Sequence, residues 1–533
     1  MDQKITRISN DFATSPQLLP EQLAAVASDG FKAIVNNRPD GEGGAAQPTS
    51  AAVESAARAA GLEYVYLPVV TGKITDGEVE AFARLLARLP NPILAFCRSG
   101  TRSGTLYKMA VEKVSADSPH SRQRQSSATR TALDVLIIGG GAAGLGIAAS
   151  LLKRQPNLRI TVVEPSDKHF YQPAWTLVGA GEFDQRKTMR PMVDCIPRGV
   201  DWVRASASAF EPEQNRVVLD SGERLEYRTL IVCPGLKLDW DGVEGLTEAL
   251  GKNGVTSNYR YDLAPYTWSL VQQLKSGKAL FTQPPMPIKC AGAPQKAMYL
   301  SCDHWRRHGV LDKIEVEFDN AGGVLFGVAA YVPPLMKYVE RYRINLAFNS
   351  NLKTVDGPAR KAWFDEKGSD GAVQRVAKAF DFLHVVPPQR APDFVRASPL
   401  ANADGWIEVD QATLRHARFD NIFSMGDVCS APNAKTVAAA RKQVVVVAEN
   451  LLAQRAGKSM PTHYDGYGSC PLTVERGKII FAEFGYGGKL LPTFPLDSMV
   501  PRRSAWLLKT KVLPIVYWDC LLKGREWFAR STG

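Results

Sequence analysis

Residues 134–154 read DVLIIGGGAAGLGIAASLLKR, an apolar run, a glycine-rich turn and the start of a helix. The pattern G-x-G-x-x-G falls on Gly139, Gly141 and Gly144, and Glu164 ends the next apolar run, RITVVE, about 20 residues later. In such a unit the glycines permit a tight turn, close approach of a pyrophosphate and close helix packing. The helix N-terminus then receives phosphate, and the acidic residue receives a ribose hydroxyl. We therefore predict a dinucleotide site here rather than a merely structural turn.

A second signal decides between NAD and FAD. The stretch Asn421–Asp427, NIFSMGD, is a short apolar strand that ends in Gly426-Asp427 and precedes a helical pattern over Thr436–Gln454. Two-dinucleotide flavoproteins use this order of elements to place an aspartate against the ribityl chain, so we expect FAD. Strand-like runs recur between the two signals, at TLIVCPG, ALF and KIEVEF. These runs predict an α/β fold with two doubly wound, Rossmann-like dinucleotide-binding domains.

The chain has 533 residues, which is more than one hydrophobic core supports. The apolar periodicity stops over Val114–Ala132, where Ser, Gln and Arg predominate, and this predicts a linker. Strand-like runs at Phe31–Asn36, Glu63–Leu67 and Pro92–Phe96 precede it and predict a small α/β domain. The expected domains are residues 1–113, the small α/β domain; 114–132, the linker; 133–490, the oxidoreductase pair; and 491–533, a tail rich in Pro, Trp and basic residues.

Composition excludes several classes of protein. With 45% hydrophobic and 22% charged residues the chain is an ordinary folded protein. No apolar run is long enough to span a bilayer and the N-terminus has no signal-peptide pattern, so we expect a cytoplasmic location. Eight scattered cysteines predict neither a disulfide framework nor a metal site. The net charge of +11 favours anionic partners such as lipid headgroups, nucleic acid or anionic substrates, and charge alone does not choose between them. With the whole sequence considered, we expect no nucleic-acid partner.

Two cysteines have unusual surroundings. Cys290 lies in PIKCAGAPQK, and Cys429 follows Asp427 by two residues, which places it near the expected flavin. Both stretches contain lysines and predicted helix N-termini, which lower the pKa of a thiol and favour the nucleophilic thiolate. The other cysteines of the region fall in apolar or helical patterns, and we expect them to be structural: Cys195, Cys233, Cys302, Cys470 and Cys520.

From Leu133 to Phe528 the chain resembles the sulfide:quinone oxidoreductase family, in the subgroup with two catalytic cysteines. The resemblance rests on HFYQPAWTLVGAG, IKCAGAPQKAMYL, NIFSMGDVCSAPNAKT, YDGYGSCPL and YWDCLLKGREW. It implies that Lys435 and Thr436 lie at the pyrimidine end of the flavin. The further FAD contacts that it implies are Ala143, Gly144, Glu164, Gln172, Ala207 and Asp393.

The resemblance also implies a mechanism. Sulfide attacks a Cys290–Cys429 disulfide and leaves a persulfide on Cys429 and a thiolate on Cys290. The thiolate donates electrons to FAD, reduced FAD passes two electrons to quinone, and the persulfide passes to a thiol or sulfite acceptor. In the family the second cysteine can follow Gly-Asp directly, whereas Val428 intervenes here. The family pattern therefore matches at Cys290, whereas Cys429 departs from it by one residue.

The N-terminal domain contains a further cysteine loop, CRSGTRS, from Cys97 to Ser103. It follows a predicted strand and opens a predicted helix, so its N–H groups and Arg102 form an anion cradle that favours a thiolate. Arg102 is the fifth residue after Cys97, the spacing of rhodaneses, whereas tyrosine phosphatases have one residue more. The domain resembles phosphatase-like modules with NNRPDGE that occur fused to sulfur-oxidising proteins. Persulfide transfer, phosphatase activity with Asp40 as general acid, and a degenerate loop remain open.

The tail Pro501–Arg530 mixes tryptophans and leucines with basic residues, and Pro514 is expected to divide it into two short helices. Such helices lie on lipid headgroups, and a lipid-soluble quinone favours that interpretation over packing on the core. We expect a peripheral protein on the cytoplasmic face of the inner membrane. The alternatives are an NADH:quinone-type flavoprotein with an N-terminal phosphatase-like domain, for which Glu315–Gly327 offers only a poor second glycine motif, and a non-enzymatic sulfur carrier.

Overall fold

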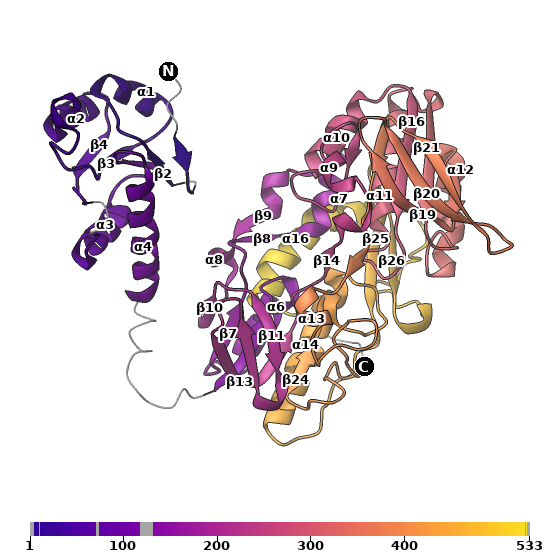
Figure 1. Ribbon diagram of the computed structural model, residues 1–533. Coiled ribbons are helices and arrows are strands. Elements are labelled where there is room, and N and C mark those ends of the chain that lie inside the picture. Colours follow the sequence, from indigo (N-terminus) through magenta and orange to yellow (C-terminus); the bar gives the residue numbers. More distant parts are fainter. Residues whose placement is uncertain (1–4, 10, 71–73, 118–131, 528, 530–533) are drawn as a thin grey trace. The chain divides into compact units, whose positions relative to one another are not determined.

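The computed structural model describes residues 5–9, 11–70, 74–117, 132–527 and 529, and divides the chain into two compact units, Met1–Thr129 and Arg130–Gly533 (Figure 1). The predicted linker 114–132 is only partly described. Its first four residues continue the helix α4, Thr101–Asp117, because Val, Ser, Ala and Asp are all tolerated in a helix. Residues 118–131 of the predicted linker lie outside the described part.

The first unit is built on a five-stranded sheet in the order β1-β2-β5-β3-β4. All neighbours pair in parallel except β1, which pairs antiparallel with β2. Helices pack on two separate hydrophobic clusters, one on each face of the sheet. The three predicted strands are confirmed as β3, β4 and β5. The elements are β1 Thr6–Arg7, β2 Phe12–Ser15, β3 Ala33–Asn36, β4 Glu63–Tyr66, β5 Ile93–Phe96, α1 Leu23–Ser28, α2 Ser50–Ala59 and α3 Asp76–Arg88.

The second unit begins with the predicted dinucleotide-binding sheet, in the order β10-β7-β6-β13-β12-β11, with β24 also paired to β13. Strands β6, β7, β10, β13 and β24 run parallel, and the glycine turn joins β6 to the helix α6. The elements are β6 Leu133–Ile138, β7 Ile160–Val163, β10 Val200–Val203, β11 Ala207–Glu211, β12 Arg216–Leu219, β13 Arg224–Val232, β24 Ile422–Ser424, α6 Ala142–Arg154 and α14 Val437–Arg455.

A second parallel sheet, in the order β15-β22-β16-β17-β18, forms the other half of the unit. The helices α11 and α12 and the hairpin β25–β26 share one hydrophobic cluster with this sheet. The elements are β15 Val255–Thr256, β16 Gly277–Gln283, β17 Ile314–Asn320, β18 Asn345–Phe348, β22 Phe382–His384, β25 Gly468–Glu475, β26 Lys478–Phe484, α10 Ala264–Gln273, α11 Ala293–Arg307 and α12 Val332–Tyr342, with a separate antiparallel sheet of β19 Ser350–Asp356, β20 Lys361–Lys367 and β21 Val373–Ala379.

The tail is helical without interruption from Arg503 to Lys523, so the expected break at Pro514 is wrong. The segment contains α15, Arg503–Leu507, and α16, Leu513–Ile515, and it widens into π-helical turns at Leu508–Val512 and Val516–Cys520. A proline removes an N–H and its ring crowds the preceding turn, and a wider turn relieves both effects.

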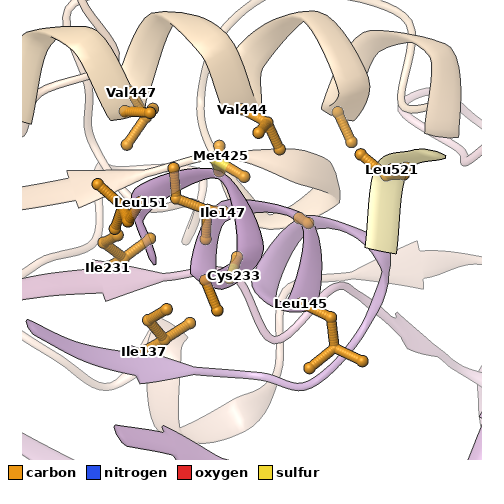
Figure 2. Packing of buried hydrophobic residues seen from close by; sticks show 14 of the residues in the cluster. Ile137, Leu145, Ile147, Leu151, Ile231, Cys233, Met425, Val444, Val447 and Leu521 are labelled. Atoms are coloured by element: carbon orange, nitrogen blue, oxygen red, sulfur yellow. The ribbon is translucent and has the colours of Figure 1, made fainter. Parts of the chain in front are cut away.

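The tail also contributes to the core of the second unit. Leu521 lies beside Val444 of α14, and α6 passes both residues (Figure 2). A Cβ atom at Gly146 would lie 2.9 Å from Leu521, so this glycine allows the tail to approach α6. In the described part of the chain no helix is both long enough and apolar enough to cross a membrane. The tail therefore has a buried face, and its other face is exposed.

Candidate active site

A cavity of about 460 Å³ in the second unit connects the glycine turn, the Asp427 turn and Cys290. It brings together most of the site residues expected from the sequence, namely Gly141, Ala143, Glu164, Gln172, Cys290, Gly426, Asp427, Lys435 and Thr436. Five others do not line it, and two of these, Gly139 and Gly144, belong to the glycine turn itself. Ala207 is buried on β11, Cys429 is buried in the core, and the exposed Asp393 is paired with Lys237 and Arg390.

The glycine turn is shaped by contacts that only glycine tolerates. Gly139 has a φ of 106°, and a Cβ on it would lie 2.5 Å from the carbonyl oxygen of Cys233. A Cβ at Gly144 would overlap the carbonyl oxygen of Gly139, whereas one at Gly141 would meet no protein atom within 4 Å. The turn therefore packs tightly against the strand and is open on the cavity side at Gly141, as a pyrophosphate requires.

Glu164 fixes the other side of this turn. Its carboxylate accepts hydrogen bonds from the amides of Gly140, at 2.7 Å, and Ser166, at 2.9 Å. His169 also holds the turn: its Nδ1 donates to the carbonyl of Gly140 at 3.1 Å, and its Nε2 accepts from Tyr517 at 2.7 Å. Burial lowers the pKa of His169 to about 4, so the ring is neutral, as this arrangement requires. Tyr517 links the turn to the tail.

The Asp427 turn precedes α14, whose first turn lines the same cavity. Thr436 caps this helix by accepting from the amide of Ala439 at 3.2 Å. Lys435 is buried and donates to the carbonyls of Asp427, at 2.7 Å, and Cys429, at 3.1 Å. Burial raises the pKa of Asp427, while Lys435 and Lys289 act in the opposite direction. The helix N-terminus and the two ammonium groups make this end of the cavity electropositive.

The thiol closest to Cys290 belongs to Cys470, with the two Sγ atoms 3.8 Å apart and both thiols free. Cys290 lies just before α11 and Cys470 on β25. Cys290 has a φ of 49°, a conformation that is uncommon for a residue with a side chain. Its amide donates to the carbonyl of Lys435 at 2.8 Å, which ties the thiol to the Asp427 turn. The backbone therefore holds Cys290 in a strained conformation at the cavity wall.

The pKa values of the two thiols are shifted in opposite directions. The hydrogen bond from Cys470 lowers the pKa of Cys290 well below its usual value against the effect of burial, and Lys296 and Lys509 lower it further. Lys296 Nζ donates to Cys290 Sγ at 3.0 Å. The same hydrogen bond and burial raise the pKa of Cys470. Cys290 is therefore the thiolate of the pair, and Cys470 retains its proton.

Lys509 is a site residue that the sequence did not indicate. It comes from the tail, its side chain is buried, and its Nζ donates to the carbonyl of Pro471 at 3.3 Å. Burial and the nearby Lys296 lower its pKa to about 7, against the attraction of Cys290 and Cys470. No sequence signal separates it from the other basic residues of the tail.

The structure places Cys470, and not Cys429, beside Cys290. Cys429 is fully buried, its Sγ donates to the carbonyl of Gly426 at 3.3 Å, and burial raises its pKa. The sequence prediction relied on the short distance along the chain between Cys429 and Asp427, but the turn directs this side chain into the core. The expectation that Cys470 is merely structural does not fit its position. The motif YDGYGSCPL already contained Cys470 and was the available signal.

In the first unit the loop after β5 surrounds Cys97, whose side chain is buried. The amide of Gly100 donates to the sulfur at 3.2 Å. Burial raises the pKa of Cys97, but hydrogen bonds from the amides of Ser103, Ser99 and Arg102 and from the Ser103 hydroxyl outweigh it, so the pKa is lowered. The predicted thiolate cradle is therefore formed mainly by backbone N–H groups.

The guanidinium of Arg102 is held by other partners. Its Nη2 contacts Glu42 at 2.6 Å, and its Nη1 donates to the carbonyl of Val69 at 2.6 Å. The spacing of Cys97 and Arg102 predicts an anion-binding role for this side chain, whereas contacts with Glu42 and two backbone carbonyls occupy most of its N–H groups. Asp40, considered as a general acid, accepts hydrogen bonds from the amide and hydroxyl of Ser50, at 2.7 and 2.6 Å.

Comparison with known proteins identifies both units. Residues 4–113 match the family of the beta-lactamase hydrolase-like protein, phosphatase-like domain, and residues 133–271 match the pyridine nucleotide-disulphide oxidoreductase family. The mitochondrial sulfide:quinone oxidoreductase of Dictyostelium discoideum is 40% identical over 77% of this chain and 90% of its own length. The chain belongs to the sulfide:quinone oxidoreductase family. The mitochondrial enzyme of Mus musculus is 37% identical over 73% of the chain and 86% of its own length.

A solved structure similar to the second unit and a curated relative of the first unit agree with this architecture. The crystal structure of the sulfide:quinone oxidoreductase from Aquifex aeolicus has the same fold over 74% of this chain and 92% of its own, with a TM-score of 0.61 and 20% identity. The first unit is 38% identical to a beta-lactamase hydrolase-like protein of Agrobacterium fabrum, over 20% of this chain and 24% of that protein. The predicted α/β flavoprotein fold with an N-terminal phosphatase-like domain is therefore confirmed.

As a member of this family the chain is an FAD-dependent oxidoreductase. The residues present fit the cofactor, because the opening at Gly141 faces the cavity and the N-termini of α6 and α14 both reach it. Glu164 lines the cavity beside the glycine turn, and Asp427 and Thr436 line it at the second turn. Cys290 lines the same cavity, so its nucleophilic sulfur lies beside the cofactor site.

Proposed function

We propose that this chain oxidises sulfide to sulfane sulfur at the pair Cys290–Cys470 and passes the electrons to quinone. The observation that carries the proposal is the contact of the two sulfurs, 3.8 Å apart, with Cys290 at the cavity wall and the Lys296 ammonium group donating to Cys290. Cys470 replaces Cys429 as the proposed partner. Membership of the sulfide:quinone oxidoreductase family favours sulfide over the NADH-dependent alternative.

The charges assign the order of the thiol steps. In the oxidised pair, hydrosulfide attacks Cys470 Sγ, the S–S bond breaks, and Cys290 leaves as a thiolate because the thiol of lower pKa is the better leaving group. The products are a persulfide on Cys470 and a thiolate on Cys290, so atoms and charge balance. Lys296 and Lys509 stabilise the departing charge. An acceptor thiol or sulfite then removes the outer sulfur from Cys470 and leaves a second thiolate.

FAD, when bound, accepts two electrons from the cysteine pair and supplies them to quinone. The protein's contribution is to hold Cys290 at the cavity wall, through its bond to Lys435, and to exclude water from the buried partner Cys470. Tyr259 steadies the turn by donating to the carbonyl of Lys289 at 2.9 Å. These contacts position the thiolate before the reaction begins.

Anaerobic titration with sulfide tests this assignment. Cys290→Ser and Cys470→Ser are each expected to retain the FAD absorbance and to lose its bleaching by sulfide. Cys429→Ser, the matched control, is expected to bleach as the native protein does. If Cys429→Ser abolishes bleaching and Cys470→Ser does not, the pair assigned here is wrong.

We propose further that the first unit passes sulfane sulfur to a thiol acceptor through Cys97. The lowered pKa of Cys97 and the N–H groups directed at its sulfur support a persulfide carrier. Covalent linkage of the two units raises the effective concentration of a sulfur acceptor for the oxidoreductase. Full-length protein should transfer sulfane sulfur from glutathione persulfide to a thiol, and Cys97→Ser should abolish this transfer without changing the bleaching of FAD. Hydrolysis of an aryl phosphate with no sulfur transfer would establish the phosphatase alternative.

We propose that the exposed face of the tail docks on the cytoplasmic surface of the inner membrane. Leu507, Val512 and Ile515 are between 41% and 58% exposed, and Arg503 and Lys511 lie exposed on the same helical segment. Apolar side chains next to cations are typical of helices that lie in the headgroup region. Leu513, Val516 and Leu521 of the same segment line the cavity, so a quinone from the bilayer would enter beside this face.

A further inference from the structure

The guanidinium of Arg102 has two of its three nitrogens occupied by the protein itself. Nη2 contacts Glu42 Oε1 at 2.6 Å, and Nη1 donates to the carbonyls of Val69, at 2.6 Å, and Asn37, at 3.3 Å. Nε is buried and has no hydrogen-bond partner among the described residues. Arginine binds an oxyanion such as phosphate with two parallel N–H groups. Of the five N–H groups of the guanidinium, Glu42, Val69 and Asn37 occupy three, so the protein itself uses most of the binding capacity of Arg102.

Glu42 is held firmly in this position. Its second carboxylate oxygen accepts from Arg38 Nε at 2.8 Å, and Arg38 Nη1 donates to Gln17 at 2.9 Å. Only 7% of the Arg102 side chain and 11% of the Arg38 side chain are exposed. Hydrogen bonds from the two arginines lower the pKa of Glu42 despite partial burial, so the carboxylate is charged at neutral pH. Arg102 of the Cys97 loop therefore has a fixed carboxylate of the protein beside it, which offsets the positive charge that an anionic ligand would otherwise meet there.

We infer that Glu42 determines the substrate class of the Cys97 loop: it admits organic persulfides and rejects the dianions thiosulfate and phosphate. This inference rests on the proposed sulfur transfer and adds the chemical class of the sulfur donor. A phosphate monoester carries about −1.5 to −2 charges at pH 7, and thiosulfate is also doubly charged. Each would meet Glu42 and the Cys97 thiolate with most of the guanidinium N–H groups already occupied. A persulfide brings at most one charge, located on one terminal sulfur, which the loop amides can accommodate.

The transfer itself needs no oxidant. The Cys97 thiolate attacks the outer sulfur of a protonated persulfide R–S–SH, a new S–S bond to Cys97 forms, and the bond between the two sulfurs of the donor breaks. The leaving thiolate R–S⁻ takes up the proton, which leaves the persulfide anion on Cys97. An acceptor thiol then removes this sulfur by the same exchange and restores the Cys97 thiolate. A single negative charge is present throughout: it lies on the Cys97 thiolate before transfer, on the leaving donor sulfur during transfer, and on the Cys97 persulfide afterwards.

Sulfur transfer by the full-length chain tests the inference, in a Cys290→Ser, Cys470→Ser background that removes both thiols of the flavin site. The native Cys97 site should use glutathione persulfide far better than thiosulfate, and phosphate should not protect Cys97 from alkylation by iodoacetamide. Glu42→Gln keeps an oxygen opposite Arg102 but removes the charge. It should improve the kcat/KM for thiosulfate by about tenfold or more, as expected for removing a unit charge at short range. Phosphate should then protect Cys97.

The matched control is Glu54→Gln, which breaks the exposed Glu54–Arg58 ion pair of the same unit and should change neither donor preference nor protection. If native protein uses both donors equally well, or if Glu42→Gln transfers sulfur with unchanged preference, the inference is wrong while the proposed sulfur transfer stands. If neither donor is used and phosphate protects native Cys97, both are wrong. Donor preference and protection of native protein are measured independently of the variants, so a misfolded Glu42→Gln does not prevent the test.

Discussion

Gly292 and Cys470 lie so close together that a Cβ atom on the glycine would stand 2.5 Å from Cys470 Sγ. The approach of β25 to the turn that carries Cys290 therefore depends on the absence of a side chain. Gly292→Ala should displace Cys470 by a fraction of an ångström to an ångström and slow the reaction of sulfide with the pair on the order of 100-fold. The measurement is the rate of anaerobic FAD bleaching in a stopped-flow instrument, together with a count of free thiols.

Gly327→Ala is the control for this change, because a Cβ atom at Gly327 meets nothing within 4 Å. It should bleach at the native rate. A Gly292→Ala protein that bleaches at the native rate would show that the distance between the two sulfurs is not critical.

Lys296 adds to the effect of Cys470 on the pKa of Cys290 through the contact between Nζ and Sγ at 3.0 Å. Lys296→Met should raise the pKa of Cys290, because the thiolate loses its nearest cation. Alkylation of the Cys290 peptide, followed by mass spectrometry across a pH series, should therefore reach its half-maximal rate at a higher pH. Lys296→Arg should restore part of the shift, and Lys252→Met, at an exposed surface position, should leave the profile unchanged. An unchanged profile in Lys296→Met would contradict the thiolate assignment.

Lys509 makes the stability of the protein depend on pH. Its pKa falls from an ordinary value of 10.5 to about 7 on folding, so between these values the unfolded state binds more protons than the folded state. Stability at this site therefore rises with pH, and the cost of burying the lysine is largest at and below about pH 7. Lys509→Met should raise the melting temperature more at pH 6 than at pH 10. Lys511→Met, at an exposed position two residues beyond Lys509, should show no such difference.

The sequence predicted the parts of the fold that depend on local pattern. The glycine turn, the parallel strands around it and the helix after Asp427 were all predicted close to their observed bounds. The strand β2, FATS, was missed because it is short and polar at its end, and its position beside β5 is a tertiary effect. The break expected at Pro514 was wrong. Proline usually interrupts an α-helix, but the wider turns of the tail allow the helix to continue through it.

The site was predicted less completely, for a physical reason. Residues on one turn, such as Gly426 and Asp427, can be placed from sequence, but Cys290 and Cys470 lie 180 residues apart and meet only after β25 packs on α11. Lys509 was missed for the same reason, since burial rather than residue type distinguishes it from Lys511. In the first unit the cysteine loop was visible in the sequence, whereas the contact of Glu42 with Arg102 was not.

The exposed face of the tail should control membrane binding separately from activity. Deletion of the whole tail would also remove Lys509 and Tyr517, so substitution at the surface is the cleaner test. Leu507→Glu with Ile515→Glu should reduce sedimentation with anionic lipid vesicles, because carboxylates replace the apolar side chains that would enter the headgroup region. The same double variant should lower activity with long-chain quinones. Activity with a short soluble quinone should be retained. Val373→Glu, at an exposed apolar residue of β21, is the control and should sediment as the native protein does. Unchanged sedimentation of the double variant would rule out this face as the anchor.

Two glycines of the dinucleotide turn should separate cofactor binding from folding. A Cβ atom at Gly144 would overlap the carbonyl oxygen of Gly139, so Gly144→Ala should destabilise the apoprotein as well as the holoprotein. A Cβ atom at Gly141 meets no protein atom within 4 Å but projects toward the space that a pyrophosphate would fill, so Gly141→Ala should leave the apoprotein near its native stability and lose FAD. Native protein should carry about one FAD per chain, measured by absorbance after denaturation, and thermal melts of apoproteins supply the comparison. Full FAD content in Gly141→Ala would show that the pyrophosphate does not approach the turn at this glycine. Bound NAD in place of FAD would overturn the cofactor assignment itself.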